Sequence, residues 1–164
     1  MILPLRHNAA MGFRRAGLLL LVFGLNMLWV RTVCAALGGN SASIIADSLE
    51  MQGSVHAYSS PQFEIQEITT ESGIRVREFV GRDGLVFAVA WSGPAEPNLQ
   101  QLLGVYFAQY HQARLAQTPP GLHRALRLAL PDLVIESGGH MRAYRGRAYF
   151  PPRLPAGAST ADLQ

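Results

Sequence analysis

The sequence predicts a small α+β domain in which one long amphipathic helix packs on one face of an antiparallel, meandering sheet of about five strands. Three observations lead to this prediction. Residues 62–91 hold short runs with the alternating pattern of half-buried strands. Turn signals containing glycine separate these runs. One longer run, residues 98–115, repeats its apolar side chains at the spacing of a helix.

The first strands are predicted on either side of two turns. Residues 62–66 alternate apolar and polar side chains, as in a strand with one buried face. The run 74–80 places its apolar side chains on one face, and Asp83-Gly84 then marks a hairpin turn. Residues 85–91 are apolar on both faces, which is typical of a central strand that is covered on two sides.

The helix signal in residues 98–115 is the strongest in the chain. Asn98 is a natural N-cap, because its side chain can accept a hydrogen bond from the first unpaired N–H groups. Apolar residues then recur at three- and four-residue spacing, and glutamines lie off this stripe. The stripe consists of Leu99, Leu102, Leu103, Tyr106, Phe107 and Tyr110. We therefore expect this helix to bury one face against the sheet.

The remaining strands are predicted in the C-terminal part of the chain. Residues 122–130 fit either a short helix or a strand. Residues 132–137 are interpreted as a strand, Gly138-Gly139 as a tight turn, and residues 140–144 as the hairpin partner. A further turn at Gly146-Arg147 leads into a short apolar run at 148–150.

Less regular segments are predicted on both sides of this domain, which is assigned to residues 62–150. Residues 36–61 are rich in Gly, Ser and Ala and are expected to be flexible, with one short helix at Ser43–Met51. The first residue of that helix is its candidate cap, and Asp47 is expected on its outer face. The tail 151–164 contains several prolines and is expected to be extended.

Residues 1–35 are predicted to form a cleavable secretory signal peptide. Arginines precede an apolar run at residues 16–30, and small residues follow it. That run is shorter than the roughly 20 residues that a membrane-spanning helix needs. We expect cleavage after Ala35 or Ala36, a periplasmic or secreted product, and no stable membrane span in the processed protein. A single membrane anchor, a lipoprotein signal at Cys34 and a twin-arginine signal are the less well supported alternatives.

Charge and cysteine content exclude several classes of function. Four of the 14 basic residues lie in residues 1–35, and residues 36–164 keep ten arginines against all 11 acidic residues. A domain this close to neutral has no general attraction for nucleic acid or anionic lipid, and we expect neither as a partner. The one cysteine, Cys34, lies in the signal peptide. The processed protein therefore has no disulfide, thiol nucleophile or zinc thiolate.

Six strings in the chain carry a resemblance to a known family. They are ALGG at 36–39, VREFV at 76–80, VFAVAWSGP at 86–94, LLGVYF at 102–107, SGGHMR at 137–142 and LPAG at 154–157. Together and in this order they resemble the exported proteobacterial proteins called domain of unknown function 2844. The resemblance extends over essentially all of residues 36–164. It implies a Gram-negative origin and one exported domain, and it supplies no activity, ligand or catalytic residue.

The most distinctive of these strings places two glycines before His140 and Arg142. In one interpretation the glycines let a ligand approach the backbone, and both side chains contact that ligand from one strand face. In the other interpretation the glycines serve only a hairpin turn, because glycine adopts positive φ without a steric penalty. His140 and Arg142 are then solvated surface residues.

Glu78 is the third candidate site residue, because it lies between Val76 and Val80 on the apolar face of its strand. A buried carboxylate must be paired, or its pKa must shift. Arg142 is a candidate partner if the two strands are neighbours. A structural ion pair and a catalytic carboxylate are the two alternatives for Glu78.

No set of residues in the sequence predicts catalysis or metal binding. The histidines have no metal-ligand spacing, and the G-x-S-x-G nucleophile motif is absent. We therefore expect no cofactor and no metal. The function expected is that of a non-enzymatic accessory protein that binds another envelope or secreted protein, for instance at an open sheet edge. The alternative is a small hydrolase or ligand-binding enzyme with its site near the Gly138-Gly139-His140 hairpin.

Overall fold

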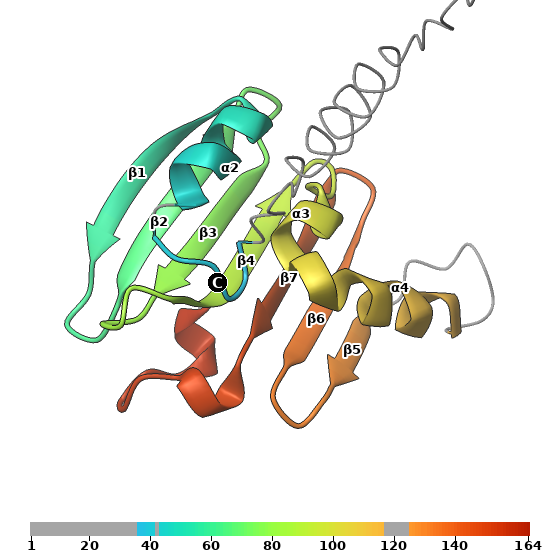
Figure 1. The fold of residues 1–164 in the computed structure, drawn as a ribbon. Coiled ribbons are helices and arrows are strands. Elements are labelled where there is room, and N and C mark those ends of the chain that lie inside the picture. The colour runs from blue at the N-terminus through green and yellow to red at the C-terminus, as the bar shows by residue number, and fades with distance from the viewer. Residues whose placement is uncertain (1–35, 42, 117–124) are drawn as a thin grey trace, which may run out of the picture. The chain divides into compact units, whose positions relative to one another are not determined.

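The domain is built on one antiparallel sheet of seven strands in the order β1-β2-β3-β4-β7-β6-β5 (Figure 1). The computed structural model describes residues 36–41, 43–116 and 125–164, so the signal peptide prediction lies outside the described residues. The α+β class and the antiparallel sheet are confirmed, whereas the prediction of about five strands is wrong. The strands are β1 (Gly53–Ser59), β2 (Glu64–Thr70), β3 (Arg75–Val80), β4 (Val86–Gly93), β5 (Leu126–Ala129), β6 (Val134–His140) and β7 (Ala143–Tyr149).

The two strands that the sequence pattern does not predict are the edge strands, β1 and β5. β1 lies within residues 36–61, which were expected to be flexible, and it is exposed along nearly its whole length. A strand with no buried face carries no alternation to recognise. β5 has only four residues and lies in the ambiguous run 122–130. Each edge strand is held by a ladder to a single neighbour.

The β6–β7 hairpin turns farther along the chain than predicted. Gly138 and Gly139 lie inside β6 and pair with residues of β7, so a tight turn at this position is wrong. The turn is formed by Met141 and Arg142, and Arg142 adopts a φ of +67°. Gly139 nevertheless adopts the positive φ, +129°, that its glycine type permits.

A layer of helices covers one face of the sheet (Figure 1). It consists of α2 (Ser43–Met51), α3 (Leu99–Leu103), the 3-10 turn η1 (Gly104–Tyr106) and α4 (Phe107–Ala116). The predicted N-cap is confirmed, because the Asn98 side chain accepts a hydrogen bond from the Gln101 N–H at 3.2 Å. The last three of these elements are continuous, and they form the long helical segment that the apolar stripe predicts.

The helix α2 has the predicted bounds but the opposite orientation to that expected. Asp47 faces the interior and is only 2% exposed, so its predicted place on the outer face is wrong. Ile45 and Leu49 point outward instead and are 67% and 75% exposed. The Gln101 side chain offsets part of the cost of burying the Asp47 carboxylate, because its Nε2 donates a hydrogen bond of 2.8 Å to Asp47 Oδ1.

The main core lies between the helices and the sheet. Trp91 and Val89 of the central strand β4 pack in it with Leu102 and Leu103 from α3. As predicted, β4 is buried on both faces over most of its length. The side chain of Trp91 also lies against Gly146 of the neighbouring strand, where an added Cβ would come within 2.2 Å of the indole ring.

A second core lies on the other face of the sheet, beneath residues 151–164. This segment was expected to be extended, but it forms two 3-10 turns, η2 (Pro151–Arg153) and η3 (Thr160–Asp162), and buries Leu163. Leu163 packs in a cluster with Phe63, Phe79 and Phe87. Because one buried leucine and the aromatic side chains beneath it hold the segment down, the tail belongs to the domain and the boundary at residue 150 is wrong.

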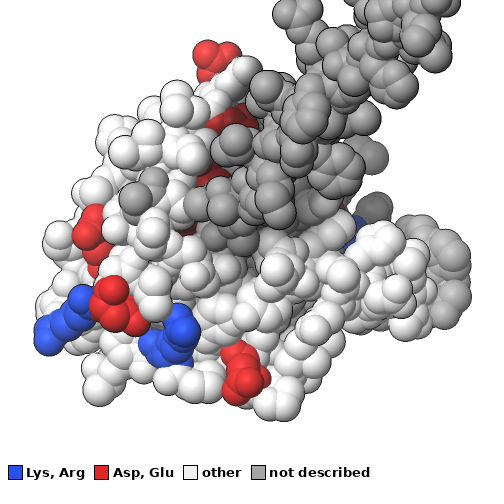
Figure 2. All heavy atoms as spheres, in the orientation of Figure 1, with Lys and Arg blue, Asp and Glu red and all other residues white. Residues whose placement is uncertain are grey.

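The covering is incomplete on this second face, and charged side chains gather where the sheet is open. On the helix-covered side, the described residues in view present mostly uncharged atoms, with arginines in few places (Figure 2).

None of the helices in the described part of the chain is long and apolar enough to cross a bilayer.

Candidate functional site

The structure does not bring the three predicted site residues together. His140 is exposed at the end of β6, with its Nδ1 atom 3.1 Å from the carbonyl oxygen of Met141. Arg142 is exposed in the turn that follows. Glu78 lies in the middle of β3 and is completely buried. No site formed by these three side chains is present.

The predicted ion pair between Glu78 and Arg142 is also wrong. β4 lies between β3 and β7, so the two residues are not on neighbouring strands. Neither carboxylate oxygen of Glu78 has a hydrogen-bond partner among the residues that the structure describes. Burial, together with the nearby charge of Asp47, raises the pKa of Glu78 to about 8. The burial of Glu78 was thus predicted correctly, and the group is kept neutral instead of paired.

Asp47 of α2 is the acidic residue whose charge contributes to the raised pKa of Glu78. Burial raises the pKa of Asp47 as well, against the opposing effect of its hydrogen bond from Gln101. Within the described part of the chain, its second oxygen, Oδ2, has no hydrogen-bond partner. The described residues contain no group of three or more His, Cys, Asp or Glu side chains arranged to hold a metal ion.

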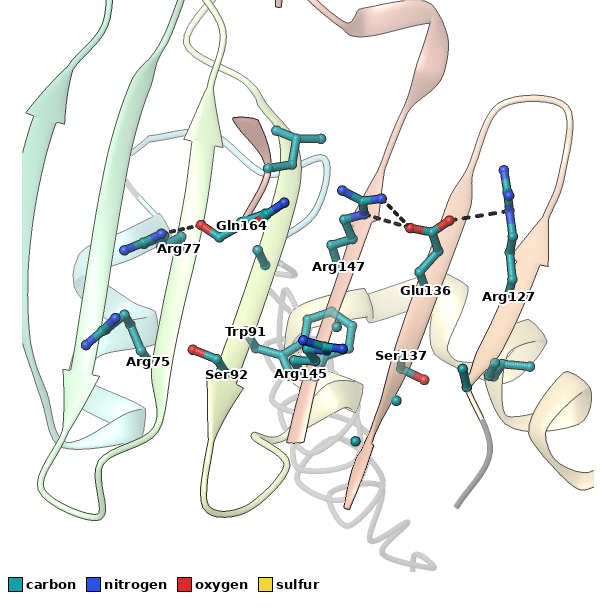
Figure 3. Close-up of a pocket in the computed structure, with 17 residues that line it drawn as sticks. Arg75, Arg77, Trp91, Ser92, Arg127, Glu136, Ser137, Arg145, Arg147 and Gln164 are labelled. Atoms are coloured by element: carbon teal, nitrogen blue, oxygen red, sulfur yellow. Dashed lines mark hydrogen bonds and ion pairs between the residues drawn. The ribbon is translucent and has the colours of Figure 1, made fainter. Parts of the chain in front are cut away.

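A groove of about 640 Å³ opens on the sheet face opposite the helices. Its walls come from β3, β4, β5, β6 and β7 and from the end of the C-terminal segment (Figure 3). A pocket of this volume is in the range that binds small molecules. Five arginines line it, accompanied by one acidic side chain, Glu136. The arginines are Arg75, Arg77, Arg127, Arg145 and Arg147.

Strand register arranges these arginines in two rows across the sheet. In the first row Arg75 of β3 lies opposite Ser92 of β4, which lies opposite Arg145 of β7. Directly opposite residues of antiparallel strands point to the same face, so all three side chains rise from one face. Figure 3 shows these three residues at one level of the sheet.

The second row is wider and runs parallel to the first. It contains Arg77 of β3, Ala90 of β4, Arg147 of β7, Glu136 of β6 and Arg127 of β5. Its strands β6 and β5 carry the acceptor and the donor of an ion pair, Glu136 and Arg127, and Ala90 leaves a shallow floor between Arg77 and Arg147. The four charged residues of this row lie at a second level in Figure 3.

Ion pairs hold the second row in place. Arg147 lies 2.6 Å from Glu136, and Arg127 lies 3.4 Å from the same carboxylate. Arg77 lies 2.6 Å from Glu67 of β2. Backbone carbonyls of the C-terminal segment accept further hydrogen bonds, that of Thr160 from Arg147 and that of Gln164 from Arg77. The second row therefore also anchors the segment that closes one end of the groove.

The first row is more loosely held. Arg145 is exposed, and its side chain makes no ion pair or hydrogen bond within the described part of the chain. Among the described residues Arg75 makes one ion pair, with Glu67 at 3.4 Å, and this carboxylate is engaged more closely by Arg77. Guanidinium groups with few protein acceptors are available to an anionic ligand, because each carries five N–H donors in a planar fork.

The sequence contains a signal for this groove that was not recognised. Arg75-Val76-Arg77 and Arg145-Gly146-Arg147 are both Arg-x-Arg strings, and within a strand such a string places both arginines on the same face. The second string was interpreted as part of a turn, so its arginines were not assigned to a strand face. Only the tertiary pairing of β4 with β7 brings the two strings to opposite sides of one groove.

Comparison with known families adds one finding. The family described as Protein of unknown function (DUF2844) matches residues 33–163. The chain belongs to this family. The resemblance predicted from the six strings is confirmed, and in this DUF2844 protein the matched region includes every strand of the sheet and the segment that carries Leu163. No curated protein and no solved structure matches the chain.

Proposed function

We propose that this DUF2844 protein is an exported binding protein of the cell envelope, without enzymatic activity of its own, that holds an anionic ligand in the arginine-lined groove. The observation that carries the proposal is the excess of guanidinium groups in the groove over the two glutamates that pair with them, Glu67 and Glu136. A ligand carried by another envelope or secreted component fits this site as well as a free one does.

The chemistry of the groove favours binding over catalysis. The seventeen described residues that line it include Ser92 and Ser137, but no histidine, aspartate or cysteine. Ser137 is already engaged, since its hydroxyl lies 3.1 Å from the Tyr110 hydroxyl. The hydrolase alternative depended on His140, Arg142 and Glu78, and these three side chains do not converge.

Export is supported by the residues that precede the domain. The positive charge, apolar run and small residues of 1–35 have the order of a signal peptide. We expect the stable protein in the envelope fraction to begin at Ala36 or Leu37, as N-terminal sequencing would show. Recovery of stable protein that still begins at Met1 would contradict export by this route.

Anion binding is tested by calorimetric titration of the protein purified from producing cells. The probes are inorganic phosphate, citrate and a short polyglutamate peptide, with glucose as the uncharged control. We expect saturable binding of at least one anion, weakened by added salt because the contacts are ionic, and no binding of glucose. Arg142→Gln is the matched control, because it removes the same charge from an exposed site outside the groove. Absence of saturable binding by all three anions at low salt would refute the proposed function.

A further inference from the structure

The groove has a more specific feature than its positive charge. We propose that Arg75, Ser92 and Arg145 form a clamp for a phosphoryl group, and that the ligand is a phosphorylated small molecule whose remaining atoms lie over Ala90 toward Leu163. This inference rests on the proposed function, since it names the chemical class of ligand for the same groove.

The geometry of the clamp follows from the register of three adjacent strands. Arg75 and Arg145 are each directly opposite Ser92, so their Cα atoms lie about 10 Å apart across β4. Arginine side chains from the two outer strands are long enough to meet above the central strand. The short side chain of Ser92 leaves this space open and offers its hydroxyl from below.

The charges in the clamp suit a dianion. Arg145 has no acidic partner in the described part of the chain, and Arg75 shares Glu67 with the closer Arg77. The two arginines therefore present nearly two uncompensated charges. In the second row, by contrast, Arg77 and Arg147 each lie 2.6 Å from a glutamate, so only Arg127, 3.4 Å from Glu136, keeps most of its charge. A phosphate monoester carries between one and two negative charges near neutral pH, which matches the first row better than the second.

The directions of the donors favour a phosphoryl group over a carboxylate. One guanidinium fork can bind both coplanar oxygens of a carboxylate in a bidentate pair. A phosphoryl group has three terminal oxygens in a pyramid, and these can accept from two forks on opposite sides and from a hydroxyl below. Arg145 and Ser92 supply two of these directions, and Arg75, which points toward Glu67 of β2 in the structure (Figure 3), supplies the third by turning over Ser92 to the ligand. A carboxylate can also accept from two arginines, as Glu136 does, but its two oxygens lie in one plane and it has no third oxygen for the Ser92 hydroxyl.

The rest of the groove indicates a ligand larger than phosphate itself. Its volume of about 640 Å³ far exceeds what one phosphoryl group fills. Ala90 forms a small apolar floor beside the clamp, and Leu163 and Gln164 of the C-terminal segment border it. A ligand whose remaining part is the size of a sugar fits this surface, because a sugar has apolar faces and hydroxyl groups at its edges.

The test uses a matched series of sugars in calorimetric titrations. The three compounds differ at the terminal carbon of the sugar. That carbon bears a phosphate ester in phosphorylated glucose, is oxidised to a carboxylate in glucuronate and bears a hydroxyl in glucose. We expect the phosphate ester to bind at least tenfold more tightly than glucuronate, and glucose not to bind. Arg75→Gln and Arg145→Gln should each weaken binding of the ester by about tenfold or more, because each removes a charge-assisted pair of hydrogen bonds.

Control variants separate the clamp from general charge. Arg142→Gln should bind the ester as tightly as the wild type does. Arg127→Gln, at the far end of the second row, should weaken binding of the ester by no more than twofold to threefold. Inorganic phosphate and vesicles containing phosphatidic acid are further arms that identify the source of the phosphoryl group. Tighter binding of either, with the same dependence on Arg145, supports the clamp and names a free ion or a lipid headgroup as that source.

Two kinds of result would overturn the phosphoryl clamp, and only the second would also overturn the proposed anion-binding function. Equal affinity for glucuronate and the phosphate ester, or full binding by Arg75→Gln and Arg145→Gln, would exclude a phosphoryl clamp and leave an anion-binding groove in place. Failure of every anion to bind the wild type would exclude both the clamp and the proposed function. Both substituted arginines are exposed, so the variants are expected to fold, as circular dichroism would check.

Discussion

Replacement of Glu78 by glutamine is expected to remove most of the loss of stability that the wild-type protein shows between about pH 4.5 and pH 8. The folded state raises the pKa of Glu78 from 4.5 to about 8, so the folded protein holds a proton that the unfolded chain releases. The stabilising effect of the neutral form is therefore complete below pH 4.5 and is lost as pH rises to about 8. At about 1.4 kcal/mol per pKa unit, the loss is on the order of 5 kcal/mol.

The measurement is urea unfolding of the two proteins at several pH values across this range. The neutral amide of Glu78→Gln does not titrate, so its free energy of unfolding should change little with pH and should exceed that of the wild type at pH 8. Some dependence will remain, because the pKa of Asp47 is raised too. Glu71→Gln, which removes the same charge from an exposed turn, should follow the wild-type curve. A wild-type protein whose stability does not fall over this range would disprove the account of Glu78.

Gly139→Val is expected to destabilise the protein by about 3 kcal/mol or more. Two separate effects contribute to this loss. The backbone at Gly139 has a φ of +129°, which a β-branched residue adopts only with strain. A Cβ atom there would also lie 2.2 Å from the Ala143 carbonyl oxygen and 2.8 Å from the Tyr144 Cα atom, and these are backbone atoms that cannot swing aside.

Gly84→Val is the matched control for this prediction. Gly84 has a positive φ of +75°, but an added Cβ would meet no atom within 4 Å. This variant should carry the conformational strain alone and lose about 1–3 kcal/mol. Thermal or urea unfolding of the two variants beside the wild type separates the two effects. An equal loss in both would show that contact with the β7 backbone contributes nothing at Gly139.

The elements that sequence analysis placed correctly are those whose burial is strong and periodic. The strand at residues 85–91 is apolar on both faces because both of its faces are covered, and the helix after Asn98 has a stripe that packs in the main core. In each case the tertiary environment acts on many consecutive side chains. The apolar pattern is then long enough to predict the element even where single residues favour turns or caps.

The elements that were missed are held by backbone pairing or by a single side chain. β1 is nearly all exposed, and its ladder to β2 imposes no sequence pattern. The C-terminal segment is fixed by Leu163 and by hydrogen bonds from Arg77 and Arg147, which no local pattern indicates. The turn was misplaced because a glycine pair signals positive φ, and here Gly139 uses that φ inside a strand.

The groove could not be predicted from overall charge, because a near-neutral domain can still sort its charges between two faces. The count of ten arginines and 11 acidic residues in residues 36–164 describes an average. Five of those arginines meet on one sheet face, where Glu136 is the one acidic residue among the described residues that line the groove. Even a correct strand assignment would have needed the pairing of β4 with β7 to bring Arg75 and Arg145 to the same groove.

The strand order has a consequence for how the chain folds. Of the six neighbouring pairs in the sheet, five join strands that follow one another in sequence, and only β4 with β7 does not. The sheet thus consists of two local meanders, β1 to β4 and β5 to β7, that are joined by the β4–β7 ladder, here called the seam. The seam joins Gly93 to Tyr144, so it closes a long loop and bears most of the loop-closure entropy of the sheet. The arginine groove straddles this seam, and a binding site between the two meanders exists only once both have folded and docked.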